Sequence, residues 1–451
     1  MTARFFSRIP GVAALATVLL LLPVDSSAQA RGKILHGFSG ERDGMNPAGR
    51  LVGDGSGNLY GASTQGTQYG GGIVFELSPI PPDGWTGRVL YTFKNFDDGG
   101  YVWGLVRDQA GNLYGMTDGG SNRGTVFKVS PGNPGQEWTK TTLYEFCPLG
   151  YGTCTDGDQP LSHLTFDSQG NLYGTTPLGG DLSCQLNPGG GCGVVFKLTP
   201  SPNGMWTQTV LHAFSGKDGF SPWNTGLIFD SGGNLYGATT EGADLSCPVP
   251  SGDGCGLVFE LSPENDGSWT ETVLHVFHGD ERGSVPLGDL VFDSAGKLYG
   301  TTLEGGDLSC SANPSYGCGI VFQLSPEPDG KWTEQVLHTF TGPDGVFPVG
   351  ELTFDPSGNL YGVAEGGGYE QCPYNPSYHG CGTVFELVQN PLGLPRARVL
   401  RFNGKDGTYP QSGVVLDAAG NLYGTAWAGG PHGGGVVYEV YAPDFPAAED
   451  R

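Results

Sequence analysis

Basic residues are scarce in this sequence. Its 451 residues include 22 Lys and Arg against 46 Asp and Glu, which gives a formal net charge of −24. A surface with this excess of negative charge repels phosphate groups and anionic lipid headgroups. We therefore expect no nucleic-acid partner and no attachment to a membrane surface.

Long apolar runs are confined to the start of the chain. Arg4 and Arg8 precede an apolar run from Gly11 to Val24, and Ala28-Gln29-Ala30 has the form of a signal-peptidase site. The run is too short and wrongly flanked for a transmembrane helix, no cysteine follows it to receive a lipid anchor, and no later segment is apolar enough to span a bilayer. We expect residues 1–30 to be a signal peptide, and the mature chain to be a soluble monomer, secreted or periplasmic.

Sustained helical periodicity is also missing after the leader, which predicts an all-β protein. The phrase Asp-x-x-Gly-Asn-Leu-Tyr-Gly returns seven times with small changes. Its tyrosines are spaced 54 to 63 residues apart, at Tyr60, Tyr114, Tyr173, Tyr236, Tyr299, Tyr361 and Tyr423. A period in this range indicates an array of supersecondary units, each too small to bury its own apolar face.

Each repeat contains four short runs of β-branched and aromatic residues separated by turn residues. Seven such units predict a seven-bladed β-propeller over residues 31–443, with a β-solenoid as the competing architecture. The seventh repeat stops after its third run, and a spare fourth run, residues 33–38, stands before the first repeat. Pairing the two would close a ring and leave no exposed edge, which favours the propeller. Residues 444–451 form a short polar tail.

The repeated phrase itself is interpreted as hairpin chemistry. Its aspartate accepts backbone hydrogen bonds from the residues that follow, and its first glycine supplies a positive φ. Seven aspartates in register also raise the possibility of calcium, which requires several oxygens that converge on one ion. The turn explanation needs no ion, so we expect no cofactor and no metal site.

The ten cysteines form five pairs of close neighbours in the sequence. Four of these pairs lie at the same place in successive repeats. A repeated pair is most simply bonded to itself, and C-x7-C is not a zinc spacing. We therefore predict five local disulfides, as expected of an exported protein: Cys147–Cys154, Cys184–Cys192, Cys247–Cys255, Cys310–Cys318 and Cys372–Cys381.

The units G-N-L-Y-G-T-T-x-x-G-G and G-x-V-F-x-L resemble the Gloeobacter/Verrucomicrobia repeat of exported bacterial proteins. The resemblance spans the whole mature chain. Members often carry a C-terminal sorting anchor, which the polar ending of this chain lacks. The resemblance implies fold and location, and it brings no established activity.

Antiparallel geometry places the loops on two faces, and the cysteine-bearing loops share the more variable one. Variable loops on a rigid scaffold are the usual place for binding sites. The position before each innermost strand varies and is expected to encircle the channel mouth on that face, and three tryptophans outside the hairpin series lie near it. These comparisons select as candidate ligand-binding residues Arg50, Trp103, His163, Trp223, Asp289, Glu351 and Trp427.

Flat aromatic rings beside carboxylates suit sugars, because sugar faces stack on the rings and hydroxyls bind the acids. The first functional hypothesis is therefore a module that binds a carbohydrate or a cell-envelope or extracellular protein through the cysteine-bearing face. The second is a polysaccharide hydrolase or lyase with Asp289 and Glu351 as an acid–base pair; the third is a purely structural surface protein. No nucleophile elbow, zinc-protease helix or phosphate loop supports an enzyme.

Overall fold

The computed structural model describes residues 32–441 and Phe445, with gaps at 41, 95–97, 120–122, 134–135, 151, 248–252, 369–371, 373–379 and 391–392. The expected signal peptide (1–30) and, except for Phe445, the expected tail (444–451) lie outside the described residues. Within this described part, the structure has no helix of the length and apolar character needed to cross a membrane.

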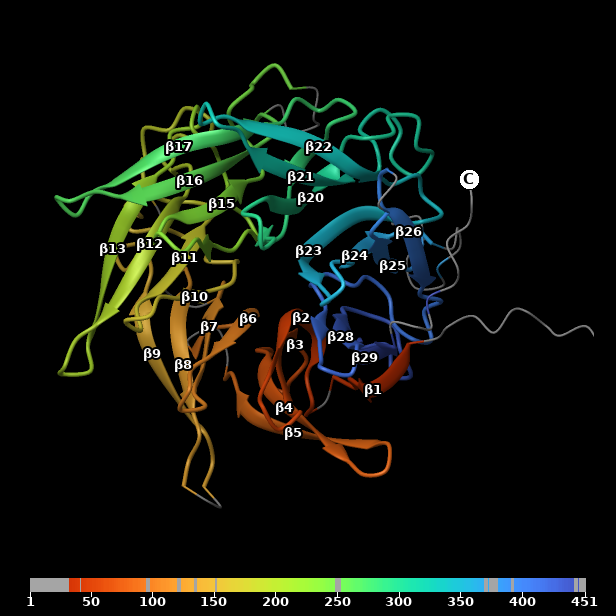
Figure 1. Ribbon diagram of the computed structural model, residues 1–451. Coiled ribbons are helices and arrows are strands. Elements are labelled where there is room, and N and C mark those ends of the chain that lie inside the picture. Colours follow the sequence, from red (N-terminus) through yellow and green to blue (C-terminus); the bar gives the residue numbers. More distant parts are fainter. Residues whose placement is uncertain are drawn as a thin grey trace, which may run out of the picture.

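The chain forms seven antiparallel sheets arranged as blades around a central axis (Figure 1). This confirms the predicted seven-bladed β-propeller. The first strand of each repeat lies nearest the axis and the fourth lies at the periphery. We number the blades along the chain, so that blade 1 begins at β2.

The strands of blades 1 to 3 are β2 (Met45–Gly53), β3 (Leu59–Gln65), β4 (Ile73–Ile80), β5 (Gly84–Thr92); β6 (Val102–Arg107), β7 (Leu113–Thr117), β8 (Thr125–Ser130), β9 (Thr139–Glu145); and β10 (Thr165–Phe166), β11 (Leu172–Thr176), β12 (Val194–Pro200), β13 (Trp206–Ala213).

The strands of blades 4 to 7 are β14 (Ile228–Phe229), β15 (Leu235–Thr239), β16 (Leu257–Pro263), β17 (Trp269–Val276); β18 (Ser284–Pro286), β19 (Val291–Phe292), β20 (Leu298–Glu304), β21 (Ile320–Pro326), β22 (Trp332–Thr339); β23 (Val346–Phe354), β24 (Leu360–Gly366), β25 (Thr383–Val388), β26 (Arg396–Arg401); and β27 (Val415–Leu416), β28 (Asn421–Ala426), β29 (Val436–Tyr441), β1 (Lys33–Gly37).

Blade 7 takes its outer strand from the other end of the chain. β1 pairs with β29, with Lys33 opposite Glu439 and Gly37 opposite Val436. This is the pairing that the sequence predicts for residues 33–38. The backbone edge of β29 is thereby covered.

The repeated turns have the predicted chemistry. The first glycine of each phrase has a φ of 79–89°. In blade 4, Asp230 Oδ1 accepts hydrogen bonds from the backbone N–H groups of Gly232 (2.8 Å) and Asn234 (2.9 Å). Its Oδ2 accepts from the Asn234 side chain (2.8 Å) and from the Tyr236 hydroxyl (3.3 Å). The aspartates therefore serve the hairpins on the face away from the cysteine loops.

The core lies between blades. An aromatic residue of each third strand, phenylalanine in blades 1 to 6 and Tyr438 in blade 7, packs edge-to-face on the phenylalanine that follows the fourth strand of the preceding blade, as Phe259 does on Phe214 at 5.3 Å. The second glycine of the phrase makes room for this ring, because a Cβ on Gly237 would lie 2.7 Å from Phe259 Cζ. The repeat sequence thus encodes the contact between neighbouring blades.

All five predicted disulfides are present, with Cα–Cα distances of 4.5–6.0 Å. In blades 3 to 6 the second cysteine also contacts the following blade. Cys318, for example, accepts a backbone hydrogen bond from Phe347 (3.1 Å), which has a φ of 60°. Equivalent bonds join Cys192 to Ser221, Cys255 to Val285 and Cys381 to Tyr409. The cysteine loops therefore connect blades as well as closing on themselves.

Candidate functional site

Four of the predicted site residues meet one another on the propeller axis. Arg50 Nη1 donates to Glu351 Oε2. His163 Nδ1 lies 3.2 Å from the Asp289 carboxylate, and the Arg50 backbone nitrogen lies 3.5 Å from His163 Nε2. Gly226 donates its N–H to Asp289 Oδ1 at 2.5 Å. We call Arg50, His163, Asp289 and Glu351 the axial network; it joins blades 1, 3, 5 and 6.

Glycines make the axial network possible. A Cβ on Gly104 would lie 2.8 Å from His163 Nε2, and a Cβ on Gly226 would lie 2.5 Å from Asp289 Oδ1. Both glycines occupy the same repeat position as the four network residues. Side chains from some blades therefore fill space that other blades leave empty, which lets charged groups cross the axis.

The network moves the pKa values of its members in different directions. Burial alone would lower the pKa of His163, but Asp289 and Glu351 outweigh it and raise that pKa. Burial alone would raise the pKa of Asp289, but His163 outweighs it and lowers that pKa. Burial raises the pKa of Glu351, and Arg50 offsets only part of this. Both shifts favour the charged forms of His163 and Asp289, because each group stabilises the charge of the other.

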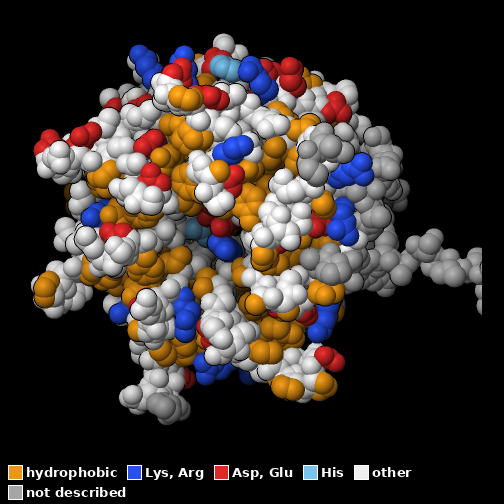
Figure 2. Space-filling model, viewed as in Figure 1, with side chains coloured by type: hydrophobic (Ala, Val, Ile, Leu, Met, Phe, Trp, Pro, Cys, Tyr) orange, Lys and Arg blue, Asp and Glu red, His pale blue; other side chains and the backbone are white. Residues whose placement is uncertain are grey.

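The axial network separates two cavities. The cavity toward the turn face has a volume of about 420 Å³ and is lined by the network and by first-strand residues that follow it, such as Leu51, Leu105 and Val415. The cavity toward the cysteine-loop face, here called the axial pocket, has a volume of about 100 Å³. Figure 2 shows acidic, basic and histidine side chains gathered at the bottom of a hollow in the middle of the molecule.

This arrangement corrects the sequence-based expectation about position. Arg50, His163, Asp289 and Glu351 were expected to encircle the channel mouth on the variable face. They fill the channel below that mouth because their side chains point across the axis and bind one another.

Two of the three predicted tryptophans do reach the mouth. The axial pocket is lined by Trp103, Trp223, Asn224, Leu287, Val349, Glu365 and Gln411. Trp223 is 48% exposed and stands at the rim. The Trp103 Nε1 atom is buried and has no hydrogen-bond partner. A buried donor without a partner costs free energy that a ligand acceptor recovers.

The polar end of the axial pocket is a glutamate–glutamine pair. Gln411 Nε2 donates to Glu365 Oε1 at 2.8 Å. Burial raises the pKa of Glu365, and the hydrogen bond from Gln411 offsets part of the increase. Acceptor and donor groups therefore lie side by side in a pocket that two tryptophans also line.

Trp427 does not line the axial pocket. Its backbone carbonyl accepts from the Asn46 side chain (3.0 Å) and its N–H donates to the Tyr409 carbonyl (3.0 Å). Glu365, which the sequence reasoning missed, stands at the equivalent repeat position, four residues after the motif tyrosine. That position reads Thr64, Asp118, Pro177, Thr240, Leu303, Glu365 and Trp427. Comparison of this second variable position would have selected Glu365.

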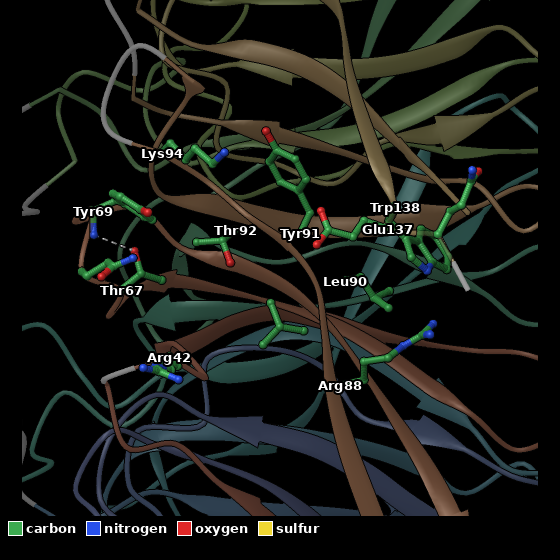
Figure 3. A pocket seen from close by; sticks show the side chains of 13 residues that line it. Arg42, Thr67, Tyr69, Arg88, Leu90, Tyr91, Thr92, Lys94, Glu137 and Trp138 are labelled. Carbon is green, nitrogen blue, oxygen red and sulfur yellow. Dashed lines mark hydrogen bonds between the residues drawn. The ribbon is translucent and has the colours of Figure 1, made fainter. Parts of the chain in front are cut away.

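A cavity of about 730 Å³ lies away from the axis, between the outer strands of blades 1 and 2 (Figure 3). Arg42, Arg88, Lys94, Tyr91 and Trp138 are among its lining residues. Arg88 pairs with Glu76 (2.8 Å) and the Tyr91 hydroxyl donates to Asp98 (2.7 Å), so part of its polar lining is already satisfied. No predicted site residue lines it.

The fold and the two axial cavities define the class: a seven-bladed repeat propeller with a closed axis. The profile of the Gloeobacter/Verrucomicrobia repeat matches residues 21–249 and 249–445, so the chain belongs to this family. This confirms the resemblance that the motifs indicate.

No curated protein matches the sequence. Among solved structures, the chain is similar to the extracellular domain of a one-component system from B. thetaiotaomicron, with a TM-score of 0.50, 12% identity, and coverage of 93% of this chain and 42% of that one. The chain thus spans less than half the length of that structure. A protein assigned as a gluconolactonase matches with a TM-score of 0.40, 14% identity, and coverage of 94% and 95%. At these identities the likeness concerns the fold alone.

Proposed function

We propose that this protein binds a carbohydrate through the axial pocket on its cysteine-loop face. The observation that carries the proposal is the convergence of Trp103 and Trp223 on the Glu365–Gln411 pair. Indole rings stack on the apolar faces of sugar rings, while carboxylate and amide groups bind hydroxyls. The unpartnered Trp103 Nε1 supplies one further donor.

The size of the axial pocket fits the edge of a single sugar ring. A volume of about 100 Å³ corresponds to the liquid volume of about three water molecules. One ring edge with its hydroxyls fills this space, and Trp223 at the rim is left to stack on the next part of the ligand. The five disulfides indicate folding in an oxidising compartment. We propose that the protein is exported and meets glycans of the envelope or the extracellular medium.

A glycan array followed by titration calorimetry tests the proposal. Trp223→Ala and Glu365→Gln are expected to weaken binding of an array hit by about 10- to 100-fold, the range for central contacts in a binding site. Tyr69→Ala is the control, because Tyr69 is an exposed aromatic residue that lies outside the axial pocket. Absence of any array hit contradicts the proposal and favours an extracellular protein partner or a structural role.

A second candidate is a polysaccharide hydrolase or lyase acting from the larger cavity. The observation in its favour is that Glu351 and Asp289 have pKa values moved in opposite directions, as in acid–base pairs. An observation against this candidate is that both carboxylates already have partners: Glu351 pairs with Arg50, and Asp289 pairs with His163. The double variant Asp289→Asn, Glu351→Gln separates the candidates: an enzyme loses turnover and keeps substrate binding, whereas a binding module shows no turnover in either form.

A further inference from the structure

The seams between neighbouring blades contain a recurring polar contact. At five of the seven seams, a residue of the fourth strand faces an aspartate from the connection that leads to the next blade. These five contacts are His36–Asp43 (3.4 Å), Tyr91–Asp98 (2.7 Å), Tyr144–Asp156 (2.8 Å), His212–Asp218 (3.2 Å) and His338–Asp344 (3.1 Å). The aspartate also caps the connection, as Asp218 does by accepting from the Ser215 N–H (2.7 Å).

A third residue reaches the seam from the fourth strand of the next blade. It lies opposite the last residue of the V-F-x-L run (a valine, Val129, in blade 2), and in blades 1 to 6 it reads Gly87, Lys140, Gln208, Glu271, Glu334 and Ala397. Glutamate occurs at this position only in blades 4 and 5, where the fourth-strand residue of the preceding blade that faces it is a histidine. The residue type at this position varies from repeat to repeat, so the sequence gives no signal that marks it.

The seam between blades 3 and 4 brings three ligand-type side chains together. His212 Nε2 lies 3.2 Å from Asp218 Oδ2 and 3.6 Å from Glu271 Oε2, and the ligand atoms of all three lie within 4.8 Å of one another. Metal–ligand bonds of about 2.0 Å at tetrahedral angles place neighbouring ligand atoms about 3.3 Å apart. The two histidine distances bracket this value. The imidazole is held edge-to-face against Phe214, at 4.8 Å between centroids.

Glu271 provides an independent indication of a ligand. Its side chain is 10% exposed and its Oε1 atom is buried without a hydrogen-bond partner. A buried carboxylate oxygen without a hydrogen-bond partner is unfavourable unless a donor or a cation satisfies it. Asp218, which is 27% exposed on the other side of the cluster, leaves a path from solvent.

We propose that His212, Asp218 and Glu271 form a binding site for a divalent transition-metal ion such as Zn²⁺. One imidazole nitrogen and two carboxylate oxygens are ligands that Zn²⁺ accepts, with water in a fourth position. Calcium fits less well, because it prefers six to eight oxygen ligands. The site joins two blades and lies at the outer strands β13 and β17, away from the axial pocket, so it supplies a structural link rather than catalysis.

The chain contains its own matched controls. At the next seam, Glu334 faces His275 at 3.4 Å, but Asp280 pairs with Arg282 (3.4 Å). At the seam after that, His338 and Asp344 form the pair, and Ala397 stands where the glutamate would be. Only the seam between blades 3 and 4 unites all three ligands among the described residues.

Competition of the oxidised full chain with a chromophoric chelator for Zn²⁺, together with visible absorption of the Co²⁺ form, tests the proposal. The wild type is expected to bind one equivalent and to give the intense bands of four-coordinate cobalt. His212→Gln and Glu271→Gln are each expected to weaken binding by more than about tenfold, since even loss of an outer-shell partner costs that much. Glu334→Gln is expected to leave affinity unchanged.

A gain-of-site variant gives a second, independent readout. Ala397→Glu places a carboxylate opposite His338 and Asp344, and it is expected to add a second equivalent of Zn²⁺. Glu271→Ala copies the residue that the fold already accepts at position 397, so it serves if Glu271→Gln fails to fold. Wild-type protein that binds no Zn²⁺, or equal binding by the wild type and both ligand variants, overturns the proposal and leaves His212 as a side-chain partner of Asp218 only.

Discussion

Single aspartate side chains hold the turns on which the blades are built. Partial burial would raise the pKa of Asp230, but hydrogen bonds from Asn234, Gly232 and Tyr236 outweigh it and lower that pKa. The same direction holds for Asp54, Asp108, Asp167 and Asp417. The ionised carboxylate is therefore the form that the folded chain stabilises.

Replacement of Asp230 by alanine removes an acceptor shared by two backbone N–H groups, an amide and a hydroxyl. We expect the free energy of unfolding to fall by about 1–3 kcal/mol, the range for hydrogen bonds to charged groups. Urea unfolding measures the loss. Asp266→Ala is the control, because Asp266 binds only Ser268 on an exposed hairpin. Equal losses in the two variants contradict the prediction.

Glu334 predicts an unusual pH dependence. Burial raises its pKa to about 7, with Arg282 lowering and Asp280 raising it, while burial lowers the pKa of the facing His275 to about 4. Because the folded pKa of this carboxyl exceeds its unfolded value, its contribution is full below about pH 4.5 and is lost as the pH rises through about 7. Glu334→Gln is expected to match the wild type near pH 5 and to be more stable by about 1–2 kcal/mol near pH 8. Thermal unfolding at both values measures this, and a pH-independent difference contradicts it.

The role of a residue can be predicted from the sequence where that role depends on the next few residues of the chain. It cannot be predicted where the role depends on contacts with a neighbouring blade. The turn aspartates follow from their own next few residues. Glu365 and His212 depend on which blades face each other and on which way a side chain points. His212 shares its repeat position with Tyr91 and Arg401, so its meaning comes from Glu271 on the next blade. A sequence comparison within repeats does not display that contact.

Among the elements, the cysteine loops act at the junctions between blades. Each second cysteine in blades 3 to 6 accepts a hydrogen bond from a residue in the left-handed region that precedes a proline. Positive φ at a bulky residue such as Phe347 is strained and requires support from its surroundings. The disulfide pairing was predictable from the sequence because the cysteine pair repeats. The hydrogen bond between the second cysteine and the next blade was not predictable, because it joins a loop to the following repeat.

The paired change Cys310→Ser, Cys318→Ser is expected to lower the free energy of unfolding by about 2–3 kcal/mol, as the chain-entropy model gives for a loop of this length. It is also expected to speed hydrogen exchange at the Phe347 amide, while the Val285 amide, which binds Cys255, stays protected. Calorimetry and exchange mass spectrometry measure the two effects. Unchanged exchange at Phe347 contradicts the junction role.

The same variant separates two interpretations of the loops. Weaker binding of a glycan hit means that the loops form a stiff wall for the ligand. Unchanged affinity with a lower melting temperature means that the disulfides serve stability alone.

At the scale of the whole molecule, the ring depends on the five-residue strand β1 at the start of the described chain. Phe38, which follows β1, is 1% exposed and packs on Phe75 of blade 1 at 5.2 Å. A chain that begins at Ser39 loses this contact and uncovers the edge of β29. We expect its free energy of unfolding to fall by more than about 3 kcal/mol, as for loss of a buried phenylalanine, and its exposed strand edge to cause association.

Light scattering after size exclusion measures that association, with a chain beginning at Arg31 as the control. A monomeric truncated chain with unchanged melting temperature contradicts the role of β1 in closing the ring.

The axial network has a consequence for how a polymer approaches the protein. Arg50, His163, Asp289 and Glu351 fill the axis between the two cavities, so a glycan strand does not thread from one face to the other. A polymer that enters from the cysteine-loop face meets a blind end after a single ring edge. For the glycan ligand proposed above, this geometry favours chain termini and branch ends over the interior of a long unbranched polysaccharide.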